Sequence, residues 1–442
     1  MILGCLKLVN RITLLDYKSS YSSFMKRLVL LFALTSPLIV FADEHNWLER
    51  IQVHGFASQG LIFTTDNNFY GDSEHGSAAM TELGLNASIQ LSPKIRLAGQ
   101  VISRNAGEMD NGSPHLDYAL LDINLITSTK GRLGAYLGRI KNPLGLYNDT
   151  RDVAHTRQGI FTAQTIYFDK VRDLTISADG AQLYGEYFLP NGTLLVQGGV
   201  GYPIPDDNVE QVYLGQDHQG KLDGNELAIV GRIMYEHDGG RWILAASGAT
   251  LDIDFEGTAA DALGPFIPGI GYIPQLLGIN SGTIGIDYTI FSAQYNSEKW
   301  QLTGELAYED INFIDIGGLF SDADVKSYGY SLEANYKFTS KWETFIRREA
   351  FYLDKEDKYG KNFEAASKQL NNTYPFIPAT PGHVRYSENW IMGMRWLISP
   401  NWMARAEYQV NKGATILSQA ENDIANTTKD WDLFAISLSY RF

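Results

Sequence analysis

The fold class is decided by the last eleven residues of the chain, Asp432–Phe442, which read D-L-F-A-I-S-L-S-Y-R-F. Apolar and polar side chains alternate here: Phe434, Ile436, Leu438, Tyr440 and Phe442 share one face, and Ser437, Ser439 and Arg441 lie on the other. Such period-two alternation suits a β-strand with one face toward lipid and the other toward water. A soluble β-sandwich also has surface strands of this kind, so the assignment depends on whether the pattern recurs.

The same alternation recurs along the chain, and a helical period does not fit these windows as well. It is clear in 82–91, 226–235, 300–309, 328–338 and 402–410. Seven short turns are predicted near 92–94, 127–131, 190–192, 236–240, 296–299, 339–341 and 399–401. Eight long stretches lie between them, at 63–78, 104–116, 142–179, 202–223, 252–282, 310–325, 353–387 and 412–429.

Fifteen connections join sixteen strands. We therefore predict an all-β fold, a transmembrane antiparallel β-barrel with short periplasmic turns and long extracellular loops. A barrel of this size is wide enough for a water-filled channel.

The tryptophans support this prediction independently. Four of them open a strand directly after a short turn: Trp242, Trp300, Trp342 and Trp402. A fifth, Trp396, lies just before a short turn. Aromatic side chains concentrate at lipid–water interfaces, so we expect these five to form a girdle on the periplasmic side.

Three segments give a mixed pattern. Arg139 shares parity with the apolar residues of 133–137, which leaves the outward face of that strand undecided. The alternation slips after Ile290, which suggests a β-bulge. Arg347 and Arg348 place one charge on each face, so one of them is expected near an interface or in a subunit contact.

The start of the chain indicates export. Met25-Lys26-Arg27 is a basic segment, an apolar run follows to Phe41, and Val40-Phe41-Ala42 has the form of a cleavage site. We predict a signal peptide over 25–42 and a barrel over 43–442. Residues 1–24 precede the signal peptide and contain Cys5, the only cysteine, so we interpret them as an upstream extension of the gene model.

Composition narrows the function classes. The formal net charge is −15, which makes the chain a poor nucleic-acid binder. The exported barrel is expected to need no disulfide, because a closed hydrogen-bonded sheet supplies its stability.

The segment 138–187 and the terminal Phe442 carry a family resemblance. The entry Gly138-Arg139-Ile140-Lys141-Asn142-Pro143 and the stretch Ile166–Asp173 resemble a porin family of Gram-negative gamma-proteobacteria, related broadly to the phosphate-selective type. The terminal Phe resembles the assembly signal of outer-membrane barrels. The resemblance implies a homotrimeric diffusion channel whose third long loop, 142–179, folds into the barrel and narrows it.

We expect the constriction to be formed by charged residues of this loop and its entry. They are Arg139, Lys141, Arg151, Asp152, Arg157, Lys170 and Arg172. The wall is expected to present Arg96, Arg232, Arg395, Arg405, Glu305 and Glu407 to the lumen, together with Glu82, Asp122, Glu186, Asp287 and Glu333. Opposed charges can orient polar solutes and set a mild ion preference. They can equally form salt bridges that hold the loop against the wall, and both can hold at once.

The sequence therefore predicts an outer-membrane porin for passive diffusion of small hydrophilic solutes and ions, surrounded by lipid and lipopolysaccharide. No catalytic residue, cofactor or metal is expected: Asp252, Asp254 and Glu256 have calcium-loop spacing but lack the glycine and distal glutamate. One alternative is a channel specific for an anion such as phosphate, an organic acid or a sugar. A barrel enzyme is less favoured, since no G-x-S-x-G motif occurs. A plugged receptor would need a large N-terminal domain.

Overall fold

The structure is a computed structural model, and it describes residues 50–320 and 323–442. The predicted signal peptide and the upstream residues 1–24 lie outside the described residues.

Most of the described chain is β-strand. The strands are β1 (Ile51–Thr64), β2 (Ser77–Ser92), β3 (Ile95–Ala106), β4 (His115–Ser128), β5 (Gly131–Lys141), β6 (Ser177–Leu189), β7 (Gly192–Pro203), β8 (Lys221–Asp223), β9 (Ala228–His237), β10 (Trp242–Glu256), β11 (Gly282–Asn296), β12 (Trp300–Ile314), β13 (Asp324–Lys337), β14 (Trp342–Tyr352), β15 (Tyr386–Leu397), β16 (Trp402–Gly413) and β17 (Asp430–Arg441).

Short helices occupy the loops. The α-helices are α2 (Arg172–Ile176), α3 (Asp207–Leu214), α4 (Ala259–Leu263), α5 (Pro274–Leu277) and α6 (Lys361–Thr373). The 3-10 helices are η2 (Ala154–Thr156), η3 (Asp169–Val171), η4 (Gly318–Phe320), η5 (Gly382–Arg385) and η6 (Ile424–Asn426). Of the helices in residues 50–320 and 323–442, none has the length and apolar character that crossing a membrane requires.

The strands close into one antiparallel barrel. Each long strand pairs with its neighbour in sequence, and β1 pairs with β17 through partners such as Phe56 with Arg441. The short β8 pairs only with the end of β10, so the wall itself has sixteen strands. The predicted fold class and strand number are confirmed.

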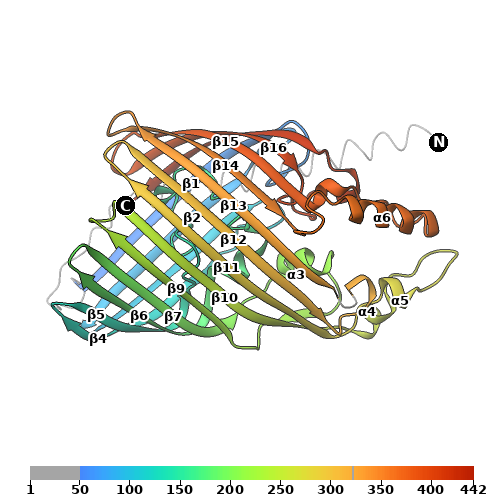
Figure 1. The fold of residues 1–442 in the computed structure, drawn as a ribbon, viewed down its shortest axis with the longest axis horizontal. Coiled ribbons are helices and arrows are strands. Elements are labelled where there is room, and N and C mark those ends of the chain that lie inside the picture. Colours follow the sequence, from blue (N-terminus) through green and yellow to red (C-terminus); the bar gives the residue numbers. More distant parts are fainter. Residues whose placement is uncertain (1–49, 321–322) are drawn as a thin grey trace, which may run out of the picture. The chain divides into compact units, whose positions relative to one another are not determined.

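The seven turns and eight loops also fall where the sequence places them. Each short turn joins two strands at one end of the barrel, and the long connections start from the other end, where those with helices α4, α5 and α6 project (Figure 1). We call these the turn end and the loop end.

The two faces of the wall differ in chemistry. In β17, Phe434, Ile436 and Leu438 point outward and are exposed, whereas Ser437 and Ser439 point inward and are buried. The tryptophan girdle is present at the turn end, where each ring packs on a neighbouring aromatic: Trp242 on Tyr295, Trp300 on Tyr336, Trp342 on Trp396 and Trp402 on Tyr440.

The bulge predicted after Ile290 is wrong. The register of β11 runs without interruption against both β10 and β12. The pattern slips because the inward face changes character: Ile286 and Ile290 point inward in one half of the strand, and Ser292 and Gln294 point inward in the other.

The other two ambiguous segments resolve by strand pairing. Arg347 points inward and pairs with Glu333 at 2.6 Å. Arg348 points outward, where it lies 3.5 Å from Glu388 and 5.5 Å from the ring centroid of Trp390. In β5, Leu133 and Leu137 are exposed on the outer face, so Arg139, which shares their parity, lies there too.

The opposite chemistry of the two faces generates a test on neighbouring residues of β7. Val196 is exposed on the outer face, and the adjacent Leu195 points inward. We expect Val196→Arg to reduce the free energy of unfolding by about 2–4 kcal/mol in lipid, because it places a charge near the middle of an apolar belt. Leu195→Arg should reduce the free energy of unfolding much less, because its side chain points into the lumen. Denaturant unfolding in lipid vesicles measures both, and equal losses would contradict the assignment of faces.

Candidate functional site in the barrel lumen

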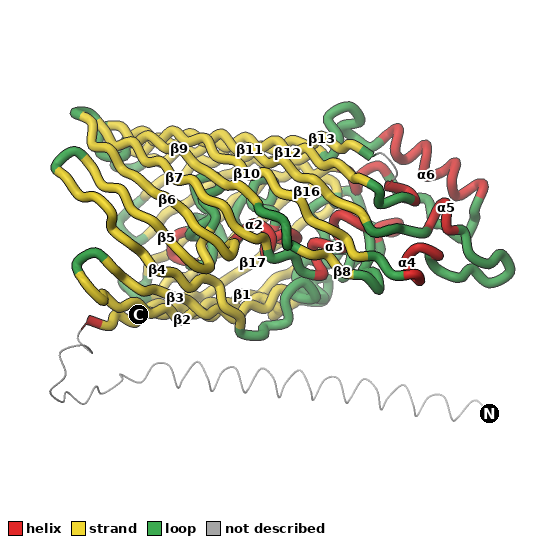
Figure 2. Tube along the Cα trace, turned by 90° about the horizontal axis from the view of Figure 1, so that it is seen from below, coloured by secondary structure: helices red, strands yellow, loops and turns green. Residues whose placement is uncertain are grey.

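The loop between β5 and β6, residues 142–176 and here called L3, lies inside the barrel. Figure 2 shows its helix α2 among the strands of the wall. L3 contacts side chains from both sides of the barrel, including Glu82 on β2 and Glu305 on β12. It therefore crosses the lumen, as the family resemblance implied.

Wall side chains hold the backbone of L3. Arg405 donates from Nη1 to the carbonyl oxygen of Ala154 at 3.2 Å, and Glu407 accepts a hydrogen bond from the backbone N–H of Ile160 at 2.6 Å. Arg347 donates to the carbonyl oxygen of Phe161 at 3.2 Å. Buried peptide groups need partners, and a loop inside a barrel has no strand ladder to supply them. Inward-facing charged side chains take that place here.

Glu305 on β12 is the centre of a second anchor. Its Oε1 accepts hydrogen bonds from the Tyr167 hydroxyl at 2.8 Å, the Ser292 hydroxyl at 2.8 Å and the Leu146 N–H at 3.1 Å. Nearby, Arg232 donates to Asp149 of L3 at 2.9 Å. These contacts fix both the start and the middle of L3.

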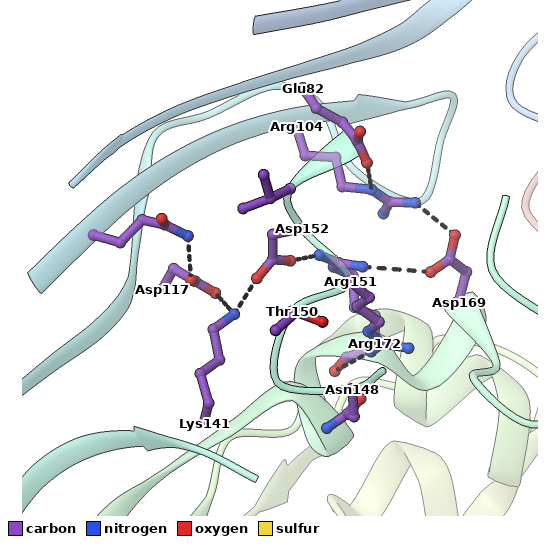
Figure 3. A network of polar contacts seen from close by, with 12 residues as sticks. Glu82, Arg104, Asp117, Lys141, Asn148, Thr150, Arg151, Asp152, Asp169 and Arg172 are labelled. Atoms are coloured by element: carbon purple, nitrogen blue, oxygen red, sulfur yellow. Dashed lines mark hydrogen bonds and ion pairs between the residues drawn. The ribbon is translucent and has the colours of Figure 1, made fainter. Parts of the chain in front are cut away.

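A third anchor is a chain of alternating charges (Figure 3). In order it runs Asp117, Lys141, Asp152, Arg172, Asp169, Arg104, Glu82 and Arg157. Arg104 contacts Asp169 at 2.8 Å and lies 4.0 Å from Glu82, and Arg172 lies 3.6 Å from Asp169. Positive and negative groups are equal in number, so the chain carries no net charge.

These charged side chains are buried, with exposed fractions between 3% and 11%. A buried charge without a partner costs several kcal/mol, so the groups depend on one another. Burial raises the pKa of Asp169, but the Arg104 and Arg151 guanidinium groups outweigh it, and the pKa lies below its usual value. Asp169 is therefore ionised at neutral pH and available to pair.

The structure separates the predicted constriction residues into three groups. Arg151, Asp152, Arg157 and Arg172 are buried in L3, with Asp152, Arg157 and Arg172 in the charge chain, and Lys141 joins the chain from the end of β5. Lys170 is half-buried and faces the loop end. The placement of Arg139 at the constriction is wrong: it lies on the outer face and pairs with Asp179 at 2.8 Å.

The predicted wall residues point inward. Arg96 lies 3.4 Å from Asp122, Arg395 pairs with Glu343, and Arg232, Arg405, Glu305 and Glu407 hold L3 as described. The expectation that Asp287 faces the lumen is wrong, because Asp287 lies on the exposed outer face of β11 together with Phe291.

Sequence reasoning missed Arg104 and Asp117 as members of the chain. The sequence predicts a loop over 104–116, which includes Arg104 and ends just before Asp117. In the structure β3 continues to Ala106, so Arg104 lies on a strand. Arg104 has the same parity as the inward-facing Arg96, and this shared parity in the sequence indicates that Arg104 also points into the lumen. Asp117 lies at a register shift between β3 and β4, which turns its side chain toward Lys141.

The other half of the lumen is apolar. L3 and the inward faces of β6, β7, β9, β10 and β11 enclose a cavity of about 90 Å³, here called the inner cavity. Its wall includes Gly199, Gly201, Val230, Ala249, Ile286 and Ile290. The wall around this cavity thus carries mainly small and apolar side chains, although Arg232 of β9 anchors L3 from the same group of strands.

Comparison of the sequence with protein-family models and with curated proteins gave no match. Solved structures do match. OprB of Pseudomonas putida has a TM-score of 0.54 at 12% identity, over 91% of this chain and 100% of that chain. OmpT of Vibrio cholerae in its trimer form has a TM-score of 0.51 at 12% identity, over 89% of this chain and 99% of that chain. The anion-selective porin from Comamonas acidovorans has a TM-score of 0.50 at 13% identity, over 89% of this chain and 99% of that chain. At these identities the similarity establishes the barrel fold.

The Glu305 anchor generates a test. Glu305→Ala removes the acceptor for Tyr167, Ser292 and Leu146, and each unpaired buried group costs about 1–3 kcal/mol. We expect L3 to loosen, so single-channel conductance should rise and current noise should increase in a planar bilayer.

The matched control is Arg139→Gln, which breaks the ion pair with Asp179 on the outer face and removes no anchor of L3. Conductance should stay at the unaltered value. If Arg139→Gln changed conductance more than Glu305→Ala, the assignment of L3 anchors would be contradicted.

Proposed function

We propose that the protein is an outer-membrane channel of the porin type, through which small hydrophilic solutes and ions diffuse passively. The observation that carries this proposal is L3, held across the lumen of a closed sixteen-strand barrel by side chains of the wall. A barrel of this size has room for a channel, and a loop fixed inside it determines the narrowest part. Transport of this kind requires no catalytic group and no cofactor.

The outer surface supports the proposed location. Its outward residues are apolar over most of the wall, and the tryptophan girdle marks one interface. Such a surface suits contact with lipid and, at the loop end, with lipopolysaccharide. Several of the similar structures are described as porins or outer-membrane proteins, which agrees with this location.

We propose that the charges of L3 act on transport mainly by fixing the loop. Asp152, Arg157 and Arg172 are each paired and buried, so they present little charge to a solute. Because the chain of eight groups is neutral, it should contribute only mild ion selectivity. Lys170 differs, since it faces open space on the loop side.

We propose a homotrimer, as the trimer form of OmpT suggests for this fold. The outer face of β1 and β2 supports it. Gln59 accepts a hydrogen bond there from Thr81 at 2.7 Å, between Ala57 and Ala79 on the same face. Polar and small side chains are unusual opposite lipid and suit a contact between subunits. Nucleic acid is not an expected partner of so acidic a chain.

The test is single-channel recording of the purified full chain in a planar bilayer under a salt gradient. We expect discrete conductance steps with a reversal potential near zero, and steps in groups of three for a trimer. Absence of any conductance, from protein shown to be folded by circular dichroism, would contradict the channel.

A further inference from the structure

The loop side of L3 opens into a second cavity of about 600 Å³, here called the vestibule. Small-molecule sites commonly have volumes of this order. Its wall is largely apolar and includes Phe168 of L3, Val212 of α3, Phe313, Phe351, Phe363 and Leu417. A vestibule that served only ions and sugars would be expected to have a polar wall, so this lining requires an explanation.

Two cations, Lys170 and Arg385, face the vestibule. Lys170 donates from Nζ to the carbonyl oxygen of Leu417 at 2.9 Å and lies 5.0 Å from the ring centroid of Phe168. Arg385 lies 4.8 Å from the ring centroid of Phe363, and its buried Nε has no hydrogen-bond partner. In residues 50–320 and 323–442 no carboxylate comes within ion-pair distance of either cation; Asp354 and Asp357 attract Arg385 only from farther away.

Arg151 and Arg405 also lack an ion-pairing carboxylate among the described residues, but they are packed against L3, whereas Lys170 and Arg385 line an open cavity. Among the described residues that line the vestibule, Glu309 is the one carboxylate, and it already accepts hydrogen bonds from Tyr213 at 3.2 Å and Ser327 at 2.9 Å. Burial lowers the pKa of Lys170 to about 7, and no neighbouring acid offsets this effect. A bound anion would supply the missing negative charge.

The vestibule adjoins the inner cavity. Phe168, Val171, Tyr213, Glu309 and Phe351 line both spaces. Beyond these shared residues the wall is formed by small and apolar side chains of β6 to β11, such as Gly201 and Ile286. A solute that leaves the vestibule in this direction therefore meets apolar surface, and its own body must tolerate that contact.

We propose that the vestibule binds small organic anions that combine one carboxylate with an aromatic or aliphatic body, with Lys170 and Arg385 holding the carboxylate and the phenylalanines holding the body. This inference rests on the proposed channel function and names the class of solute that the channel selects. Charge complementarity fixes the sign of the ligand, and the apolar wall distinguishes it from inorganic phosphate, for which an array of arginine donors would be expected.

The test is calorimetric titration of the full chain in detergent with benzoate, benzamide and inorganic phosphate. We expect saturable binding of benzoate, and at least tenfold weaker binding of benzamide, which lacks the charge, and of phosphate, which lacks the apolar body. Lys170→Gln and Arg385→Gln should each weaken benzoate binding at least tenfold. Lys326→Gln removes an exposed cation that pairs with Asp310 and Asp324 outside the cavity, and it should change affinity less than twofold.

Absence of saturable benzoate binding, equal binding of phosphate, or unchanged affinity in both vestibule variants would overturn the proposal. Benzamide tests the charge contact without altering the protein, so the proposal stays testable if a variant fails to fold. Conductance is recorded separately. A conducting protein that binds no benzoate would contradict this inference alone, whereas a protein that binds benzoate but does not conduct would contradict the channel alone.

Discussion

The structure depends on the pairing of L3 with the inward face of the barrel wall. A loop inside a closed sheet brings buried peptide groups and charged side chains into a space with no strand ladder to satisfy them. Arg405, Glu407 and Arg347 bind the loop backbone, Glu305 gathers three donors, and a chain of eight charges connects L3 to β2, β3 and β5. If one member is removed, its neighbours are left buried and unpaired, so the anchors stabilise the loop cooperatively.

This arrangement explains why the charges of L3 do not make it an electrostatic filter. The sequence alone is equally compatible with a transverse field and with a set of salt bridges among these residues. The geometry favours salt bridges for Asp152, Arg157 and Arg172, because each is buried and contacts an opposite charge. The charges free to act on solutes are then few, and Lys170 and Arg385 are the clearest of them. The anchors of L3 come from strands around the whole wall, whereas the inner cavity and the vestibule have mostly apolar linings.

The barrel itself could be predicted from the sequence, since alternation, turn residues and tryptophan positions are local signals. Strand number, turns, loops and the inward face of β16 all followed from them. The contacts of L3 could not be predicted, because they join residues far apart in the chain, such as Arg157 with Glu82. The error at Ile290 has a clear physical cause: the inward face of β11 is apolar up to Ile290 and polar from Ser292, and this change imitates the slip that a bulge produces. Apolar residues at successive positions of β11 indicate that both of its faces are apolar there, as the lining of the inner cavity requires.

The central claim is that L3, fixed to the wall, limits passage through the barrel. It is tested most directly by the ratio of single-channel conductances between the unaltered protein and a variant in which residues 149–172 are replaced by a short glycine–serine linker. This change removes the segment that crosses the lumen and leaves every wall strand in place. The account predicts a conductance increase of several-fold, whereas an unchanged conductance in a folded variant would contradict it.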